Sequence, residues 1–451
     1  MKRILIYLSS ACLIFLCSCT PSADGGGQEN PPVNSPDTSV TEDPASPGEQ
    51  EDPVGQGEPG GGDRTDEPAD GIPVATEYNI ENGPTPRMLA LSRLNTGNRA
   101  RLAEKLKKAE DGGELTVAYM GGSITQGTGG GNNGCYARLT QNWFEQTYPD
   151  AKTNYLNAGI GATGSYIGVF RADKDVIAYR PDIVFVEFSV NDTTEHTERN
   201  KNSYDSLIRK LWLSPSAPAV ITVAMTQENG ASFQQYHEEI AKFYDIPMIS
   251  YKNAILDVIA SGYIKWTDIS GDNIHPNSAG HRVLSELLID YLNDANENSE
   301  DISGAESDFS TSYTGDQYAD ARQIKPGDTE ITSSGAFAEF ENSFGNIKGY
   351  WRLAADGEIP GGGAITAEVE AKSIALFFGK LTGSGGRLEI IVDGKTEKTV
   401  NTAFPNGWGN YVEVEEIVTF SEKGTHTVEI RPLPAEDGGK ANFVVSAIAV
   451  S

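Results

Sequence analysis

The chain has 451 residues, a net charge of −29 and 22% charged side chains. This length can accommodate two domains and further segments. The acidic balance excludes a nucleic-acid-binding protein, which needs basic patches to replace counterions, and it disfavours attraction to anionic lipid headgroups.

The N-terminus has the features of an export signal. Lys2 and Arg3 precede an apolar run at residues 4–16 that is too short to span a bilayer comfortably. The run ends in Leu-Cys-Ser-Cys, which resembles a bacterial lipobox. This resemblance implies that residues 1–18 are a lipoprotein signal peptide and that Cys19 carries the lipid. We therefore expect the mature protein at the extracellular face of the cell envelope, anchored to the membrane; the alternative is an ordinary signal peptide.

Residues 19–75 form a segment of low complexity. They are rich in Pro, Gly and Ser, and they contain thirteen acidic residues but one basic residue, Arg64. Such a segment cannot bury enough apolar surface to offset the entropy of ordering, so we predict a disordered acidic tether. Beyond it Cys135 is the only cysteine, which leaves no intramolecular disulfide. We interpret Cys135 as a small buried residue.

Strand and helix patterns alternate between residues 76 and 299. Near-continuous apolar runs predict strands at residues 115–120, 154–158, 183–188, 219–225 and 247–250. Helical patterns lie at residues 99–109, 136–147, 166–179, 204–213, 233–244 and 278–292. The alternation predicts a parallel sheet with helices on both faces.

After residue 299 the helical periodicity ends. Residues 300–332 are polar and turn-rich, which predicts a linker. Residues 333–451 contain short alternating runs, and the pair Asp393-Gly394 is a strong hairpin signal. Regular short strands with Gly-rich turns predict a C-terminal β-sandwich domain.

The first predicted strand runs into Gly-Gly-Ser at residues 121–123. The carboxyl ends of parallel strands form the catalytic edge of such a sheet, and the two glycines permit a tight backbone path that presents the hydroxyl and N–H of Ser123. A Gly-rich strand end can also hold phosphate. However, the segment lacks the third spaced glycine of a dinucleotide fingerprint and the lysine of a P-loop.

Three further blocks follow at the same predicted edge. Small residues at 157–164 let backbone N–H groups approach an oxyanion, and Asn191 offers a side-chain amide donor. Asp272 and His275 lie three residues apart before the last helix, so the carboxylate can orient the imidazole from one side of a turn.

Histidine is scarce in this chain, which helps to identify a base. There are five histidines, and only His275 has a carboxylate three residues before it. Of the others, His196 lies in a charged stretch and His237 on a polar helix face. His281 lies in the final helix, and His426 lies on a strand of the second domain.

In this order the four blocks resemble those of the SGNH (GDSL-type) hydrolase superfamily, over about residues 117–281. The Gly-Gly-Ser version resembles bacterial polysaccharide-acting acetylesterases more than lipases. The resemblance implies a flavodoxin-like parallel sheet, in agreement with the strand pattern. It also implies that Ser123 is the nucleophile and that Asp272 and His275 complete a catalytic triad.

The same resemblance implies an oxyanion hole. Its donors are the Ser123 N–H, the Gly161 N–H and the Asn191 amide; Gly161 requires a one-residue gap, and Ala162 is the ungapped alternative. The chain departs from the family pattern at two positions. Gly122 replaces the usual Asp and Ser189 the usual Gly, and both changes can reshape the acyl pocket.

Three aromatic residues of the second domain are candidates for sugar binding. Trp351, Trp408 and Tyr411 could stack on pyranose rings, or they could fill the core of the sandwich. The domain resembles accessory β-sandwiches found beside carbohydrate esterases.

The implied chemistry is ester hydrolysis through an acyl-enzyme, without a cofactor or metal. The leading interpretation is an O-acetylesterase that acts on an acetylated poly- or oligosaccharide. A lipase, lysophospholipase or thioesterase of the same superfamily is an alternative, disfavoured because no long apolar lid is visible near the blocks. A carbohydrate-binding lipoprotein with an inactive hydrolase fold is another, disfavoured by the intact catalytic residues.

Overall fold

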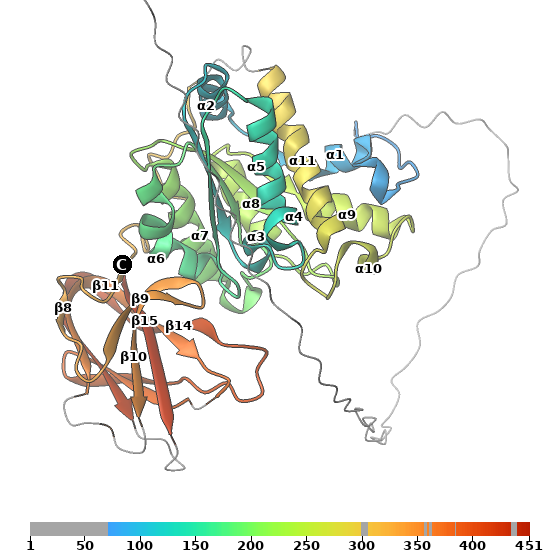
Figure 1. Cartoon of the computed structure of the whole chain (residues 1–451). Coiled ribbons are helices and arrows are strands. Elements are labelled where there is room, and N and C mark those ends of the chain that lie inside the picture. The colour runs from blue at the N-terminus through green and yellow to red at the C-terminus, as the bar shows by residue number, and fades with distance from the viewer. Residues whose placement is uncertain (1–70, 299–304, 356–358, 360–362, 384, 434–439) are drawn as a thin grey trace, which may run out of the picture. The chain divides into compact units, whose positions relative to one another are not determined.

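A computed structural model of the chain describes residues 71–298, 305–355, 359, 363–383, 385–433 and 440–451 (Figure 1). The expected signal peptide, Cys19 and nearly all of the expected tether lie outside these residues. Within the described part of the chain, no helix combines the length and the apolar character that crossing a membrane requires.

The first half of the described chain is built on a six-stranded sheet with the order β1-β6-β5-β4-β2-β3. All neighbouring pairs are parallel except the edge pair β1–β6, which is antiparallel. This confirms the predicted parallel sheet. The strands are β1 (Arg93–Asn95), β2 (Leu115–Gly121), β3 (Thr153–Gly159), β4 (Ile183–Glu187), β5 (Ala219–Ala224) and β6 (Met248–Ser250).

Helices cover both faces of this sheet. The longer ones are α2 (Ala100–Glu110), α5 (Tyr136–Thr147), α6 (Ser165–Asp175), α7 (Thr197–Trp212), α8 (Gln234–Phe243), α9 (Tyr251–Ala260) and α11 (Ser278–Glu297). Shorter helices are α1 (Pro86–Ser92), α3 (Ser123–Gln126), α4 (Gly131–Gly134) and α10 (Trp266–Ile269), with 3₁₀ turns η1 (Ile80–Asn82), η2 (Ile177–Tyr179) and η3 (Thr194–His196).

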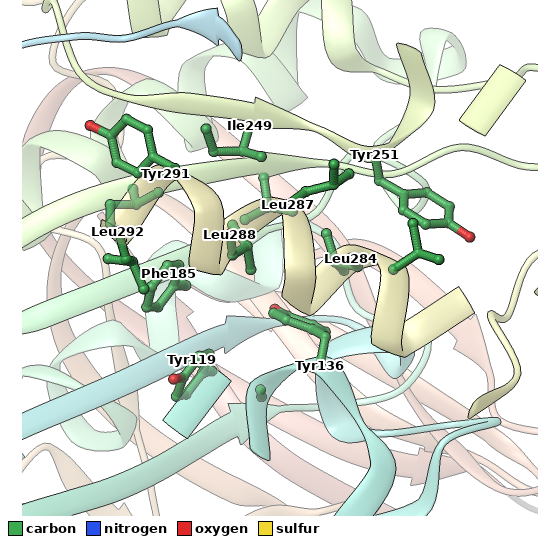
Figure 2. Close-up of a cluster of buried hydrophobic side chains, with 14 of the residues drawn as sticks. Tyr119, Tyr136, Phe185, Ile249, Tyr251, Leu284, Leu287, Leu288, Tyr291 and Leu292 are labelled. Atoms are coloured by element: carbon green, nitrogen blue, oxygen red, sulfur yellow. The ribbon is translucent and has the colours of Figure 1, made fainter. Parts of the chain in front are cut away.

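The two faces of the sheet have separate apolar cores. On one face α11 packs its leucines between Tyr136 of α5 and strand residues such as Phe185 and Ile249 (Figure 2). Each such buried side chain contributes about 1.5–3 kcal/mol. On the other face α6, α7 and α8 pack on the alternate strand residues, among them Val184 and Val186. Both faces are therefore buried, which explains why the strands lack a polar alternation.

The second half is all β. Its strands are β7 (Arg322–Ile324), β8 (Ile331–Ser333), β9 (Ala338–Phe344), β10 (Ile347–Ala355), β11 (Ile365–Lys380), β12 (Arg387–Val392), β13 (Lys395–Asn401), β14 (Tyr411–Leu433) and β15 (Ala441–Val450). They join into one antiparallel sheet, and most of its buried side chains form one apolar core. This is the sandwich-like second domain that the short strands predicted. Asp393 and Gly394 both have positive φ, as a type I′ hairpin turn requires.

The segment expected to be a linker is largely structured where it is described. Phe309 stacks on Tyr244 with ring centroids 4.2 Å apart, and Tyr318 is buried against α6. Strands β7 and β8 pair with β15 and β11. The all-β part therefore draws on residues that the polar, turn-rich sequence had indicated as a connection.

One apolar core is shared between the α/β part and the all-β part. Phe170 of α6 meets Phe377 of β11 edge to face, with ring centroids 6.0 Å apart. Ala447 and Ala449 of β15 belong to the same cluster of buried residues. These strand residues point away from the core of the sheet, so its outer face is buried as well. The two parts accordingly fall within one compact unit.

Candidate active site

Ser123, His275 and Asp272 are brought together at the carboxyl end of the parallel sheet. Ser123 is the first residue of α3, directly after β2. Its Oγ lies 2.8 Å from Nε2 of His275, whose Nδ1 lies 2.7 Å from Oδ2 of Asp272. With the Nδ1 proton directed to the carboxylate, Nε2 is left to accept the hydroxyl proton of Ser123.

The turn that carries Asp272 and His275 is closed by local hydrogen bonds. Oδ1 of Asp272 accepts from the backbone N–H groups of Ile274 and His275, both at 2.7 Å. The Trp266 indole donates to the Asp272 carbonyl at 2.6 Å. Partial burial raises the pKa of Asp272, but the hydrogen bonds from His275 and Ile274 outweigh burial, so its pKa lies below the ordinary value. The carboxylate is therefore ionised at neutral pH.

A glycine-rich loop after α3 packs against this turn. A Cβ on Gly129 would lie 2.0 Å from the Pro276 carbonyl oxygen, so only glycine fits there. His281 anchors the same loop: its Nε2 lies 2.9 Å from the Thr128 carbonyl oxygen and its Nδ1 accepts from Tyr136 N–H at 3.2 Å. His281 is fully buried, so its role is to hold this loop on α11.

Asn191 lies beside the nucleophile in a space that glycine leaves open. Its Oδ1 is buried, and a Cβ on Gly122 would stand 2.2 Å from that atom. The departure from the usual Asp at position 122 thus creates room for Asn191. Ser189, the second departure, is buried and receives a 2.7 Å hydrogen bond from Met225 N–H, so its hydroxyl joins β4 to β5.

Gly161 is close to Ser123, but its N–H already has a partner. The N–H donates to Oε1 of Gln126 at 2.8 Å, and a Cβ on Gly161 would lie 3.8 Å from the Ser123 Cβ. The next residue, Ala162, has φ 58°. This left-handed conformation is unfavourable for a residue other than glycine. Strain is therefore concentrated in the turn predicted to supply an oxyanion donor. Gln126 was not among the residues predicted for the site.

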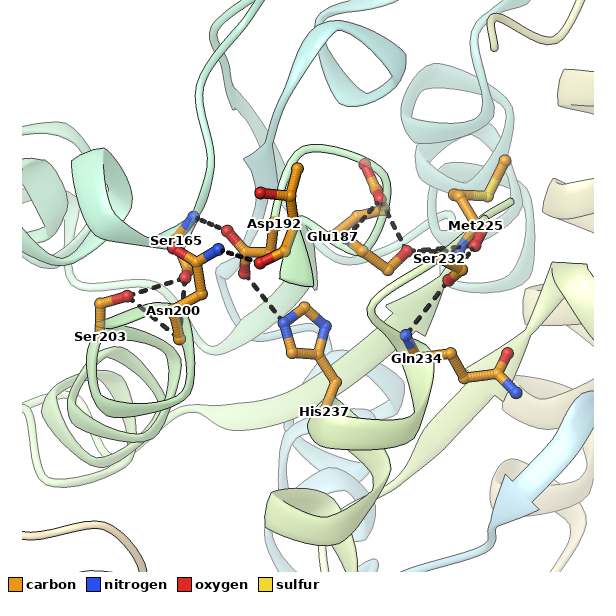
Figure 3. A network of polar contacts seen from close by, with 11 residues as sticks. Ser165, Glu187, Asp192, Asn200, Ser203, Met225, Ser232, Gln234 and His237 are labelled. Atoms are coloured by element: carbon orange, nitrogen blue, oxygen red, sulfur yellow. Dashed lines mark hydrogen bonds and ion pairs between the residues drawn. The ribbon is translucent and has the colours of Figure 1, made fainter. Parts of the chain in front are cut away.

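A buried polar network connects the segments that end at the catalytic edge of the sheet (Figure 3). Asp192, next to Asn191, accepts from the Ser165 N–H at 2.8 Å and lies 3.0 Å from His237 Nε2. His237 is fully buried and stacks on Tyr204, so its expected place on a polar helix face is wrong. Its spacing from Phe233 and Ile240 puts it on the apolar side of α8 instead, a signal that the sequence did contain.

Glu187 is a buried carboxyl group at the end of β4. Its Oε1 accepts from the N–H and the hydroxyl of Ser189 at 3.1 and 3.2 Å (Figure 3). Burial raises the pKa of Glu187 to about 7, and the Ser189 hydrogen bonds only partly oppose this shift. Glu187 is thus a titratable group near the site that does not touch the Ser–His–Asp array.

A groove with a volume of about 1040 Å³ begins beside the nucleophile turn. Gln126 of α3 and Tyr155 of β3 both line it. Tyr179 and Phe340, both exposed, come from the α/β part and from β9 respectively. Phe340 stacks on Tyr350 with centroids 5.1 Å apart, which fixes its ring. The groove therefore offers aromatic surface to a ligand that extends from Gln126, three residues after Ser123.

The three aromatic residues proposed for sugar binding have different surroundings. Trp351 has no exposed surface and lies in the core of the all-β part, so of the two roles that the sequence left open it fills the core and is not a stacking surface. Trp408 is 71% exposed and stacks on Tyr411 with centroids 5.0 Å apart. Trp408 and Tyr411 thus remain candidates.

The geometry is suited to attack by a serine hydroxyl on an ester. A base adjoins the nucleophile, and an ionised carboxylate orients the base. In the part of the chain that the structure describes, no three His, Cys, Asp or Glu side chains are grouped to hold a metal ion.

Comparison with known proteins gives a consistent result. Residues 119–283 match the model of the GDSL-like Lipase/Acylhydrolase family. Two crystal structures of a two-domain esterase active on acetylated mannans are similar to the chain at 31% identity, and one was co-crystallised with mannopentaose. That one has a TM-score of 0.72 and the other 0.73; each covers 80% of this chain, and the matches span 97% and 98% of the solved chains. Among curated proteins, no sequence matches.

Proposed function

Because the chain belongs to the GDSL-like lipase/acylhydrolase family and is a serine carboxylic-ester hydrolase, we propose that it removes O-acetyl groups from a polysaccharide. The observation that carries the proposal is the contact of 2.8 Å between Ser123 Oγ and His275 Nε2, with Asp272 2.7 Å from the other ring nitrogen.

In the proposed reaction, His275 takes the proton of Ser123 as Oγ attacks the acetyl carbonyl carbon. The sugar oxygen leaves with that proton, and an acetyl-enzyme remains. Water then attacks the acetyl-enzyme with His275 as base, which releases acetate and restores Ser123. Asp272 stabilises the imidazolium formed in each step. The Ser123 N–H, the Gly161 N–H and the Asn191 amide face the oxyanion, and each such donor is typically worth ~10²–10³ in rate.

Two features support an acetylated saccharide as the substrate. The similar two-domain esterase is active on acetylated mannans, and the groove that Gln126 lines carries the exposed rings of Tyr179 and Phe340. Aromatic faces pack well on the apolar faces of sugar rings. We further propose that the Trp408–Tyr411 pair makes a second sugar contact. Trp408→Ala should then weaken binding to the polymer while hydrolysis of p-nitrophenyl acetate stays unchanged.

We also propose that the mature protein is held at the extracellular face of the cell envelope by lipid on Cys19. Two or more acyl chains anchor a protein stably, whereas a single chain binds only marginally. Cys19→Ser should therefore move the protein out of the membrane fraction. Release of the wild type itself into the medium would contradict the anchor.

The proposed function is tested by acetate release from a panel of acetylated glycans, compared with hydrolysis of p-nitrophenyl acetate and octanoate. We expect acetate release, faster cleavage of the acetyl than of the octanoyl ester, and loss of all three activities in Ser123→Ala. A higher kcat/KM for octanoate would favour a lipase. Failure of the wild type to react with a fluorophosphonate would favour an inactive, carbohydrate-binding protein.

A further inference from the structure

The Gln126 side chain occupies a backbone donor next to the nucleophile. Its Oε1 accepts a hydrogen bond from the Gly161 N–H at 2.8 Å. A Cβ on Gly161 would lie 2.9 Å from this oxygen and 3.8 Å from the Ser123 Cβ, so the three residues meet at one point. Gln126 is exposed and lines the groove. The side-chain carbonyl of Gln126 thus occupies the Gly161 N–H, which an ester oxygen would need as a hydrogen-bond donor.

This contact joins two segments that are fixed relative to each other. Gln126 is the last residue of α3, and its N–H donates to the Gly122 carbonyl at 3.0 Å. The Asn157 side chain donates to the Thr125 carbonyl at 2.8 Å, which ties the end of β3 to α3. The hydrogen bond between Gln126 and Gly161 is therefore a feature of the site's geometry, although the Gln126 side chain itself can rotate into solvent.

We propose that Gln126 competes with the substrate for the Gly161 N–H and, once displaced, binds a hydroxyl group of the sugar. This inference rests on the proposed function, because it takes Gly161 as an oxyanion donor and a sugar as the leaving group. Gln126 is a positioning residue in the first role, since it acts through Gly161. In the second role its amide offers both a donor and acceptors to the groove.

The competition distinguishes the substrate from the transition state. The ester carbonyl is a neutral acceptor, like the Gln126 amide, so exchanging one for the other gains little. The oxyanion is charged, and charge-assisted hydrogen bonds are roughly twice as strong as neutral ones. Gly161 is therefore released to the oxyanion in preference to the bound ester. Interactions that strengthen only in the transition state raise kcat rather than tighten substrate binding.

The test is Gln126→Met, which keeps most of the volume and removes the acceptor. On p-nitrophenyl acetate, which has no sugar hydroxyl, kcat/KM should rise about 2- to 10-fold, because one net hydrogen bond no longer opposes the reaction. On an acetylated oligosaccharide kcat/KM should fall, mainly through a higher KM. Gln146→Met, on the exposed side of α5, is the matched control and should change neither.

A small fluorophosphonate gives a second readout, since its phosphonyl oxygen enters the same donor site. Gln126→Met should be labelled faster than the wild type, whereas Gln126→Glu should be labelled more slowly, because its carboxylate holds the Gly161 N–H more strongly and repels an oxyanion.

Lower kcat/KM on both substrates in Gln126→Met would overturn the proposal, because Gln126 would then support the site rather than compete for it. Unchanged activity on both would also overturn it. If the wild type released no acetate from any glycan, the proposed function would fail, while a rise on p-nitrophenyl acetate would still support the competition.

Discussion

A Cβ atom on Gly122 would stand 2.2 Å from Oδ1 of Asn191. Gly122→Ala must therefore displace the Asn191 amide, and φ at this position is −88°, outside the left-handed region. We expect kcat on p-nitrophenyl acetate to fall by ~10²–10³, the typical effect of losing one oxyanion donor. Gly383→Ala is the control, because a Cβ there meets nothing within 4 Å. Wild-type kcat in Gly122→Ala would exclude Asn191 as a donor.

Asp272→Asn tests whether Asp272 acts in catalysis by orienting the imidazole ring of His275, or only stabilises the fold. The amide cannot stabilise the imidazolium, so we expect kcat to fall by a factor on the order of 10³ with little change in KM. Asp393→Asn is a matched control, since Asp393 also lies 2.7 Å from a histidine Nδ1, that of His426, but in the all-β part. Equal losses in the two variants would point to a general loss of stability.

Glu187 should make the protein less stable as pH rises from about 4.5 to about 7. Its pKa is raised to about 7, mainly by burial, so the folded state keeps a proton that the unfolded state loses. Below about 4.5 both states are protonated; above about 7 both are ionised and the loss is complete, on the order of 3 kcal/mol. Glu187→Gln should flatten this dependence in urea unfolding at several pH values. Glu422→Gln, on the exposed surface, should retain it.

The shared core predicts that the α/β and all-β parts unfold together. Phe377→Ala removes a ring buried against Phe170 and should cost about 3–5 kcal/mol. Thermal unfolding should stay a single transition at a lower temperature, with equal calorimetric and van't Hoff enthalpies. Leu213→Ala, at a 60% exposed position, should leave the transition in place. Two separate transitions, with only one shifted, would contradict a common core.

Tyr179 should contribute to binding of a saccharide but not to the chemical step. Its side chain is 58% exposed and lines the groove that begins at Gln126. Tyr179→Ala should raise KM for an acetylated oligosaccharide, by an amount corresponding to ~1 kcal/mol of ring contact, with unchanged kcat on p-nitrophenyl acetate. Tyr263→Ala removes an exposed ring outside the groove and is the control. An unchanged KM in Tyr179→Ala would place the sugar elsewhere.

The α/β sheet could be predicted because each of its central strands is buried on both faces. Such strands appear as unbroken apolar runs, and β2 to β6 were found within a few residues of their observed ends. Strand β9 could not be found, since its residues are mostly exposed and carry no alternation. Strand β11 alternates buried and more exposed residues up to Lys372 and is buried on both faces beyond it, so one strand contains two hydrophobic patterns.

The candidate site was predictable to the extent that its residues stand in short blocks. Ser123, Asp272 and His275 were expected to meet, and they do. For Trp351 both sugar stacking and the core stayed open, because an aromatic residue in a strand gives the same pattern whether it faces the core or solvent. Gln126 was missed because its contact with Gly161 depends on how α3 and the end of β3 are placed in space. The sequence spacing between Gln126 and Gly161 does not predict this placement.

The acid and base of the site differ from its nucleophile in how the fold brings them together. Asp272 and His275 are three residues apart, and their turn is closed by its own hydrogen bonds. Ser123 lies 152 residues before His275, and the two meet only when the sheet, the glycine loop and α11 have all docked. A partly folded chain can thus retain the acid–base pair and still be inert, which makes esterase activity a direct measure of completed folding.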